Sequence, residues 1–417
     1  MTTHPLRHCA AGIVAAWAFG CAAAAPLQPE PIALPGAIRL ALDGPRLRAA
    51  GHEAAATAAE AVQAGHYPNP ILEYLREGEQ AGTRTTTVQI SQPIELGGKR
   101  RARVALADST AAQARDELAA LRQEVRAEAI AAWYAVRTAQ ERQALAQALS
   151  ALAGKSIDVA ARQVAAGKVS PIDETRARLA AAEARTELNA AAADLALART
   201  RLGALVGRPA DTLLLAPGED APLPALKPLP ALLAEAAQSL PVRRARGQLA
   251  AQEAQTRVER AARLPDLTLT VGSQKIDDVG RRQAVVGVSL PLPLFNRNEG
   301  KLLAALRRSD KARDELAAAE TETASELGTA YTRYEQARLD ADLLRAEVIP
   351  SARSAYELTL TGFEHGKFAF LDVLDAQRTW ARVQARQWAA TQEAWRAWAD
   401  IARLAGAAIE QEGREQP

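Results

Sequence analysis

The sequence predicts a mainly α-helical protein with a small β part, and three observations lead to this fold class. Only 4% of the 417 residues are aromatic and alanine is abundant, a composition that suits long, closely packed helices better than a globular core of large side chains. Two long segments, 99–166 and 301–365, contain almost no proline. The same order of elements also occurs twice along the chain, at an offset of 198 or 199 residues.

Charge limits the possible partners. The chain has 51 basic and 49 acidic residues, which gives a formal net charge of +2 at pH 7. This balance provides no basic field of the kind that nucleic-acid binding requires. We interpret the charged residues as the solvated faces of helices, and no nucleic-acid partner is expected.

Residues 1–25 have the features of a signal peptide. Arg7 lies in a short leading segment, residues 9–21 are mostly apolar, and residues 22–25 are the small residues of a cleavage site. The apolar run is too short for a membrane-spanning helix, which needs about 20 residues. Cleavage near Ala24 or Ala25 removes both cysteines, so the mature chain is expected to have no disulfide. A lipid anchor on Cys21 is an open alternative, because Phe19-Gly20-Cys21 is an imperfect lipoprotein signal.

Beyond the signal, the chain divides into a first repeat, a proline-rich connector, a second repeat and a polar tail, which span residues 26–206, 207–230, 231–406 and 407–417. Each repeat opens with an alanine-rich helical stretch, 36–65 in the first and 230–263 in the second, which ends before a proline. The connector contains too much proline to be a helix. The tail is expected to be disordered.

Two strand-like runs follow the helical stretch of each repeat. The four runs are 71–77, 84–94, 266–275 and 282–292. Apolar side chains alternate with polar or small ones, for example at Val88 and Ile90 and, 198 residues later, at Val286 and Val288. This period of two predicts strands with one apolar face, and runs of roughly 9 to 11 residues suit tilted strands that cross a bilayer. For either pair alone, a hairpin packed on helices is the alternative.

A very long helix is expected after each strand pair, over 99–166 and 301–365, and the second is interrupted only at Pro350. Residues at steps of three and four share a heptad register in both copies, which is typical of coiled-coil packing. These seam residues are Val125, Ala129, Ala132, Val136, Ala139 and Ala146 in the first copy and Thr323, Leu327, Ala330, Tyr334, Ala337 and Leu344 in the second. At 1.5 Å per residue, such a helix is on the order of 100 Å long, several times the thickness of a bilayer.

A glycine turn ends each long helix, and the chain then returns as a second helix, from 171 to about 205 and from 368 to about 404. Gly167 matches Gly366, and Asp173 matches Asp372, at an offset of 199. Asp375 lies three residues after Asp372, so the two carboxylates share one face of the returning helix.

Four strands cannot close a barrel by themselves, and lipid does not tolerate an open sheet edge. If the strands cross a membrane, several chains must therefore share one barrel. The long helices, which begin where the strands end, would extend that tube away from the membrane.

The chain resembles the TolC family of outer-membrane efflux channels over nearly its whole mature length. The resemblance rests on the two copies of helix, strand pair, long helix and glycine turn and on the segment Leu371-Asp-Val-Leu-Asp-Ala-Gln377. Tyr67-Pro-Asn-Pro70 and Gln92-Pro-Ile-Glu-Leu-Gly-Gly-Lys-Arg100 are most similar to its CzcC-like branch, which serves cobalt, zinc and cadmium efflux.

The resemblance implies an assembly and a location. It implies a homotrimer with a shared 12-stranded β-barrel in the outer membrane and a long coiled-coil helical barrel that crosses the periplasm. The implied partners are a periplasmic adaptor, or membrane fusion protein, and an inner-membrane pump of the resistance-nodulation-division (RND) type. The implied function is heavy-metal efflux.

The resemblance also implies a periplasmic gate at the two glycine turns. Asp173, Asp372 and Asp375 match acidic residues that line or tie the aperture. Where the best-known members have an arginine that pairs across the gate, this chain has Phe368, and Lys168 and Lys367 are the nearest candidate cations. The alternative is that the aspartates only stabilise the first turn of a helix, where the helix dipole favours negative charge.

The residues show no motif for catalysis or for a metal site, so neither an enzyme nor a cofactor is expected. The five histidines are His4, His8, His52, His66 and His365, and they lack the spacing of metal ligands. A periplasmic coiled-coil adaptor is a competing class, but it would not have two membrane-length strand pairs. A duct for drugs or other organic solutes is the alternative within the channel class.

Overall fold

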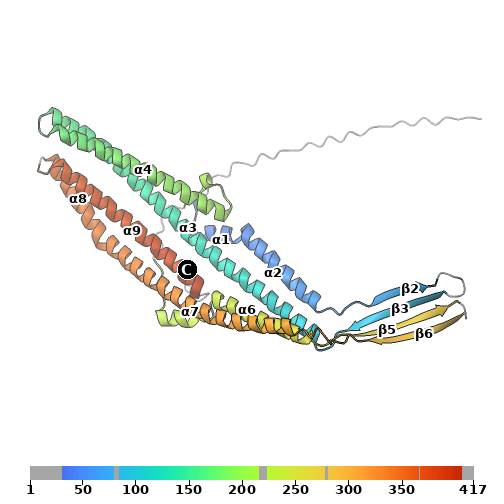
Figure 1. Ribbon diagram of the computed structural model, residues 1–417. Helices are drawn as coiled ribbons and strands as arrows, with labels where there is room; N and C mark the ends of the chain where they lie inside the picture. The colour runs from blue at the N-terminus through green and yellow to red at the C-terminus, as the bar shows by residue number, and fades with distance from the viewer. Residues whose placement is uncertain (1–30, 79–83, 216–222, 278–279, 366, 406–417) are drawn as a thin grey trace, which may run out of the picture.

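The computed structural model describes residues 31–78, 84–215, 223–277, 280–365 and 367–405. The molecule is elongated, with a β-sheet at one end and the turns of two helical hairpins at the other (Figure 1). The long helices and the small set of strands confirm the predicted fold class. Within the described ranges, no helix combines the length and the apolar character that a membrane span needs.

The elements follow the same order in both halves of the chain. In the first half they are α1 (Leu34–Leu42), α2 (Pro45–Ala64), β2 (Ile71–Glu77), β3 (Thr85–Ile94), α3 (Lys99–Ala165) and α4 (Pro171–Val206). In the second half they are α5 (Leu229–Ala236), α6 (Leu240–Ala261), β5 (Leu267–Ile276), β6 (Arg281–Ser289), α7 (Glu299–Leu343), α8 (Ile349–Glu364) and α9 (Phe370–Ala405). Strand β6 ends before residue 292, because Pro291 and Pro293 cannot donate hydrogen bonds to a strand ladder.

The single opening helices expected over 36–65 and 230–263 are wrong, because each is a pair of helices with a short break between them. Pro45 begins α2, and Pro241 lies in the first turn of α6. Proline fits the first turn of a helix, where its missing N–H group leaves no helical hydrogen bond unmade. It cannot continue the preceding helix, so α1 and α5 end before it.

The connector begins with two short elements. The 3₁₀ helix η1 (Ala210–Thr212) precedes β4 (Leu214–Leu215), which pairs in parallel with β1 (Pro31–Ile32). The indole of Trp133 on α3 donates its Nε1–H to the Ile32 carbonyl at 3.1 Å. These bonds fix the start of the described chain against the first hairpin.

A π-helical turn, Leu344–Val348, separates α7 from α8, so the interruption expected only at Pro350 begins earlier. Equivalent residues of the two repeats are 198 positions apart in the sequence up to this turn and 199 positions apart after it. A π turn holds one more residue than an α turn, and it absorbs that residue without rotating the helix that follows. Ala146 is equivalent to Leu344, the first residue of the turn, and Ile157 is equivalent to Tyr356, which follows the turn. Both pairs pack into the interior.

The predicted heptad seam forms the interior of the helical part. Every seam residue is buried except Ala132, which is half-buried. Tyr334 donates its hydroxyl to the Pro224 carbonyl, and burial raises the pKa of Tyr334 to about 12. Tyr134 of α3 stacks on Trp395 of α9 with ring centroids 4.1 Å apart, which joins the first hairpin to the second.

Candidate functional site

The four long strands form one antiparallel sheet in the order β2-β3-β5-β6. Register sets residues of all four strands side by side, as in the row Leu72, Ile90, Val271 and Val286. Strands β3 and β5 are each 10 residues long, the length that a tilted membrane strand needs, roughly 9 to 11 residues. Strands β2 and β6 each have one partner within the chain, so the sheet has two open edges.

One face of this sheet is apolar and exposed. Its large side chains are Leu72, Tyr74, Val88, Ile90, Leu269, Val271, Val286 and Val288, and each is at least 40% exposed. A continuous apolar face of this kind is typical of a surface that contacts lipid or another protein.

The opposite face is mostly polar, although Ile71 and Leu75 also lie on it, and several of its polar side chains bond to one another. Gln89 donates to Glu73 at 2.7 Å, and Gln283 donates to Gln274 at 2.6 Å. Ser91 and Thr270 share a hydrogen bond of 3.0 Å across the central strand pair. This face is suited to line a water-filled interior.

Gly272 allows a close approach of β3 and β5 on the polar face of the sheet. A Cβ atom at this position would lie 2.5 Å from the Val88 carbonyl oxygen and 2.6 Å from the Gln89 Cβ. Strands β3 and β5 therefore approach here more closely than any side chain allows.

Ion pairs fix the helices to the base of the sheet. Arg103 of α3 bonds to Glu95 just after β3, and Lys99 bonds to Asp266 just before β5 at 2.7 Å. Two consecutive glycines, Gly97 and Gly98, have φ values of +70° and +73°, which an L side chain rarely adopts. Strand β3 thus passes into α3 through a short link, residues 95–98.

The turns at the other end have matching backbone bonds. Gly167 has φ of +71°, and Lys168 N–H donates to the Gln163 carbonyl at 2.9 Å, the pattern of a Schellman motif. In the second hairpin, Lys367 N–H donates to the Gly362 carbonyl at 2.8 Å. Gly366 lies outside the described residues.

The helices after the turns begin with different caps. Ser170 caps α4 through its Oγ atom, which accepts from the Ile172 N–H. Ala369 holds the equivalent position before α9 and has no hydroxyl. There the carboxylate of Asp372 accepts the Ala369 N–H at 2.9 Å, as the third residue of a capping box does. Asp372 therefore has a structural role as well as a negative charge.

The other predicted gate residues also lie at these turns. Asp173 pairs with Arg176 at 3.3 Å. Asp375 occupies the position equivalent to Arg176, at an offset of 199, and is exposed. Lys168 and Lys367 are both exposed on the turns. The second turn thus has a larger share of negative charge than the first.

Phe368 packs on its own hairpin. A Cβ atom at position 362 would collide with the Phe368 ring, so Gly362 provides the space for that ring. Phe363, Tyr356 and Val373 of the second hairpin form one buried cluster with Ala160 and Ala177 of the first. The two hairpin tips are therefore packed together.

An ion pair joins the hairpins just behind the tips, and sequence reasoning missed it. Arg378 of α9 bonds to Glu183 of α4, next to a cavity of about 290 Å³ between α3, α4 and α9. In the sequence, Arg378 is visible only as a basic residue three positions after Asp375. That spacing does not identify Glu183, which lies 195 residues away, as its partner.

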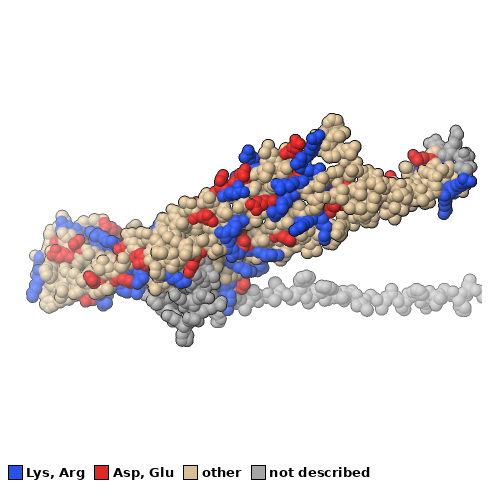
Figure 2. Space-filling model, turned by 90° about the horizontal axis from the view of Figure 1, so that it is seen from below, with Lys and Arg blue, Asp and Glu red and all other residues tan. Residues whose placement is uncertain are grey.

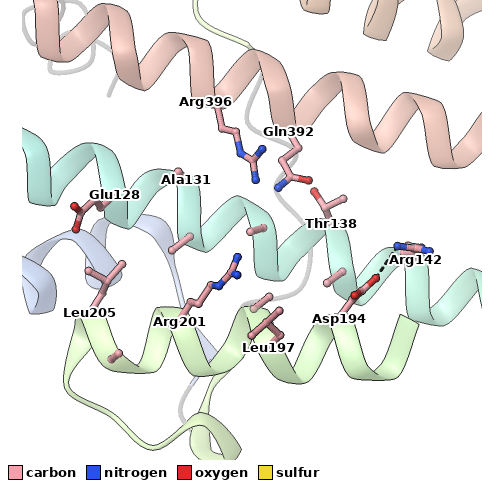
Figure 3. A pocket seen from close by; sticks show the side chains of 15 residues that line it. Glu128, Ala131, Thr138, Arg142, Asp194, Leu197, Arg201, Leu205, Gln392 and Arg396 are labelled. Atoms are coloured by element: carbon pink, nitrogen blue, oxygen red, sulfur yellow. Dashed lines mark hydrogen bonds and ion pairs between the residues drawn. The ribbon is translucent and has the colours of Figure 1, made fainter. Parts of the chain in front are cut away.

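A larger cavity of about 690 Å³ lies farther from the tips, between the same three helices (Figure 3). Arg142 bonds to Asp194 at 2.7 Å at one end of it. Alanines line much of its wall, and Arg201, Gln392 and Arg396 extend toward it from two helices. The seam of small side chains thus leaves space between the hairpins.

The histidines of the described chain do not form a metal site. His66 and His365 are exposed, and each places Nδ1 within hydrogen-bond distance of a carbonyl one helical turn earlier, at 3.1 and 2.7 Å. His52 is exposed on α2. Across the described ranges, no group of three or more histidine, cysteine or acidic side chains could hold a metal ion. Cys21 and the predicted signal lie outside these ranges.

Comparisons with known proteins agree over most of the chain. Residues 39–208 and 232–407 match the family described as outer membrane efflux protein. The chain is 39% identical over 378 residues to the cobalt-zinc-cadmium resistance protein CzcC of Cupriavidus metallidurans, and the match covers 90% of each chain. It is 31% identical over 261 residues to the nickel-cobalt-cadmium resistance protein NccC of Alcaligenes xylosoxydans xylosoxydans, which covers 61% of this chain and 59% of that one.

A solved membrane protein from Pseudomonas aeruginosa has the same fold. The two structures superpose with a TM-score of 0.78 at 22% sequence identity, and the match covers 89% of this chain and 90% of the other.

Proposed function

Because this chain belongs to the outer membrane efflux protein family, we propose that it is the outer-membrane channel of an efflux system for divalent heavy-metal cations such as cobalt, zinc and cadmium. The observation that carries the metal assignment is the 39% identity to the cobalt-zinc-cadmium resistance protein CzcC over 90% of both chains. The protein acts as a conduit, and no catalytic step is assigned to it.

The channel is a homotrimer in this proposal. The two open edges at β2 and β6 must be paired in lipid, where unpaired backbone groups cost several kcal/mol each. Three chains with four strands each would close a 12-stranded barrel, with the polar face that includes Gln89 and Gln274 on the inside.

The helices carry the conduit across the periplasm. Helix α3, and α7 followed by α8, run from the sheet to the two turns, and α4 and α9 return from the turns part of the way (Figure 1). At the far end the tunnel meets a periplasmic adaptor and an inner-membrane pump of the RND type. The pump selects the metal, which agrees with the lack of a metal-ligand group in the described residues of this chain.

The turns form the periplasmic gate. Asp372 and Asp375 are exposed on one face of α9, and three chains would bring six such carboxylates to one constriction. A ring of this kind attracts cations and repels itself when ionised. Asp173 and the lysines at 168 and 367 surround it, and the Arg378–Glu183 pair holds the two hairpins together behind it.

Deletion and complementation test the substrate. Cells without the gene should become sensitive to zinc, cobalt or cadmium, and the wild-type gene should restore tolerance. A gene with His52→Ala, His66→Ala and His365→Ala should restore it equally, because a conduit needs no histidine ligands. Sensitivity to organic solutes alone would favour the drug-duct alternative. Failure of the histidine variant despite normal assembly would mean that the channel binds metal directly.

A further inference from the structure

The apolar face of the sheet ends in a row of basic side chains. Arg76 of β2, Lys275 of β5 and Arg282 of β6 lie side by side, with Thr86 of β3 between the first two. Strand alternation places this row on the same face as Leu72, Ile90, Val271 and Val286. The three basic residues are all exposed.

The row marks an abrupt change from apolar to charged surface. The neighbouring row, two residues closer to the helices, is Tyr74, Val88, Ser273 and Ala284, at a distance of about 7 Å along the strands. Lys and Arg gather at the free end of the sheet, beyond a part with few charged side chains (Figure 2). The basic row therefore lies where a membrane-spanning sheet leaves the hydrocarbon.

The charge of the row is only partly balanced. Lys275 pairs with Asp277 in the loop beyond the strands at 2.9 Å. The pKa of Asp277 is lowered by its hydrogen bond from Lys275 and by the nearby charges of Arg84 and Arg76, so this carboxylate lies within a group of cations. Among the described strand residues on this face there is no carboxylate.

The opposite face at the same level has a different character. The row on that face consists of Glu77, Thr85, Ile276 and Arg281. It contains one acidic and one basic residue, so its formal charges cancel. A general excess of basic residues at the tip of the sheet would appear on both faces. The excess is confined to the face that carries the apolar side chains.

We infer that Arg76, Lys275 and Arg282 bind the phosphate groups of lipid headgroups in the outer leaflet of the membrane. The apolar rows contact the acyl chains, and the long basic side chains reach the phosphates at the level where the hydrocarbon ends. Arginine suits this role because its guanidinium group can donate two parallel hydrogen bonds to one phosphate. The inference rests on the proposed function, since it needs the sheet to stand in the bilayer.

Binding of a phosphorylated glycolipid tests the inference. The full chain is purified in detergent and titrated with lipid A, which carries two phosphates, and with the same lipid after removal of its phosphates. The test variant combines Arg76→Gln, Lys275→Gln and Arg282→Gln. The control variant combines Arg307→Gln, Lys311→Gln and Arg313→Gln, which removes the same charge from exposed positions on α7.

Wild type and control should bind lipid A alike, and the test variant should bind it at least tenfold more weakly, because each cation near an anionic surface strengthens binding by roughly fivefold. Equal affinity of the test variant, or equal binding of the phosphate-free lipid by wild type, would overturn the inference. Conductance of the same preparations in planar bilayers is recorded in parallel. Channels that conduct without this lipid binding would refute the inference alone, whereas absence of conductance would refute the proposed function.

Discussion

Arg378 of α9 forms an ion pair with Glu183 of α4 and thereby links the two helical hairpins directly behind their tips. Both side chains are 55% exposed, so the pair contributes at most about 1 kcal/mol. A link of this strength suits a gate, because it favours one arrangement of the hairpins without locking it.

Reversing one charge of this pair should favour the open channel. In Arg378→Glu two carboxylates face each other, and the open probability in single-channel recordings should rise by up to about fivefold, the equivalent of about 1 kcal/mol. The double variant Arg378→Glu with Glu183→Arg should return to the wild-type value. Reversal of the Arg353–Glu357 pair, which lies within α8, is the control and should change nothing. Additive effects in the double variant would show that the pair does not hold the gate.

The two aspartates of α9 should have separable effects. Asp375→Asn should reduce cation selectivity in single-channel recordings without changing thermal stability, because Asp375 is exposed and caps nothing in the described structure. Asp372→Ala should reduce selectivity and also destabilise the tip by about 1 kcal/mol, since the Ala369 N–H loses its acceptor. Unaltered selectivity in both correctly assembled variants would place the gate elsewhere.

The π-helical turn gives a deletion test of the repeat offset. Deletion of Ala346 together with Pro350→Ala should convert the turn into α-helix and leave assembly intact, because later residues keep their register. The proline is replaced because it would interrupt a continuous helix. Deletion of the equivalent Ala148 in α3 is the matched control.

The control deletion should fail to assemble. It rotates every later residue of α3 by about 100° and moves Ala153 and Ala160 out of the interior. Size-exclusion chromatography and thermal unfolding distinguish the two outcomes. Equal behaviour of both deletions would mean that the π turn does not account for the extra residue.

Glycine is required at 272 but not at 287. In Gly272→Ala the new methyl group meets the Val88 carbonyl oxygen at 2.5 Å, and the strain should destabilise the sheet by roughly 1–3 kcal/mol. The control Gly287→Ala makes the same substitution on the same face of the sheet. There the new Cβ atom would lie 3.6 Å from the Thr270 Cβ, an ordinary van der Waals contact. The thermal midpoint of the assembled protein should fall only in the first variant. A similar fall in both would point to backbone flexibility rather than close strand approach.

The sequence predicts the elements better than the contacts between them. Alternation at Val88 and Ile90 identifies β3 because the signal is local. The breaks before Pro45 and Pro241 could also have been predicted, because a proline cannot continue a preceding helix, but the alanine-rich composition on both sides of each proline suggested one helix. The Arg378–Glu183 pair depends on how two hairpins pack, which no local pattern encodes.

The candidate gate shows the same limit. The glycine turn and the spacing of Asp372 and Asp375 are visible in the sequence, and the resemblance supplies their role. The bond between Asp372 and the Ala369 N–H follows from a capping-box spacing that could have been recognised. The space for the Phe368 ring at Gly362 depends on the folded turn and could not.

The shared barrel is the central claim, and the mass of the detergent-extracted assembly tests it most directly. Native mass spectrometry should give three times the mass of one mature chain, together with circular dichroism that shows both helix and strand. A stable monomer that retains the full native circular dichroism would contradict the claim, because the open edges of β2 and β6 would then need no neighbouring chain.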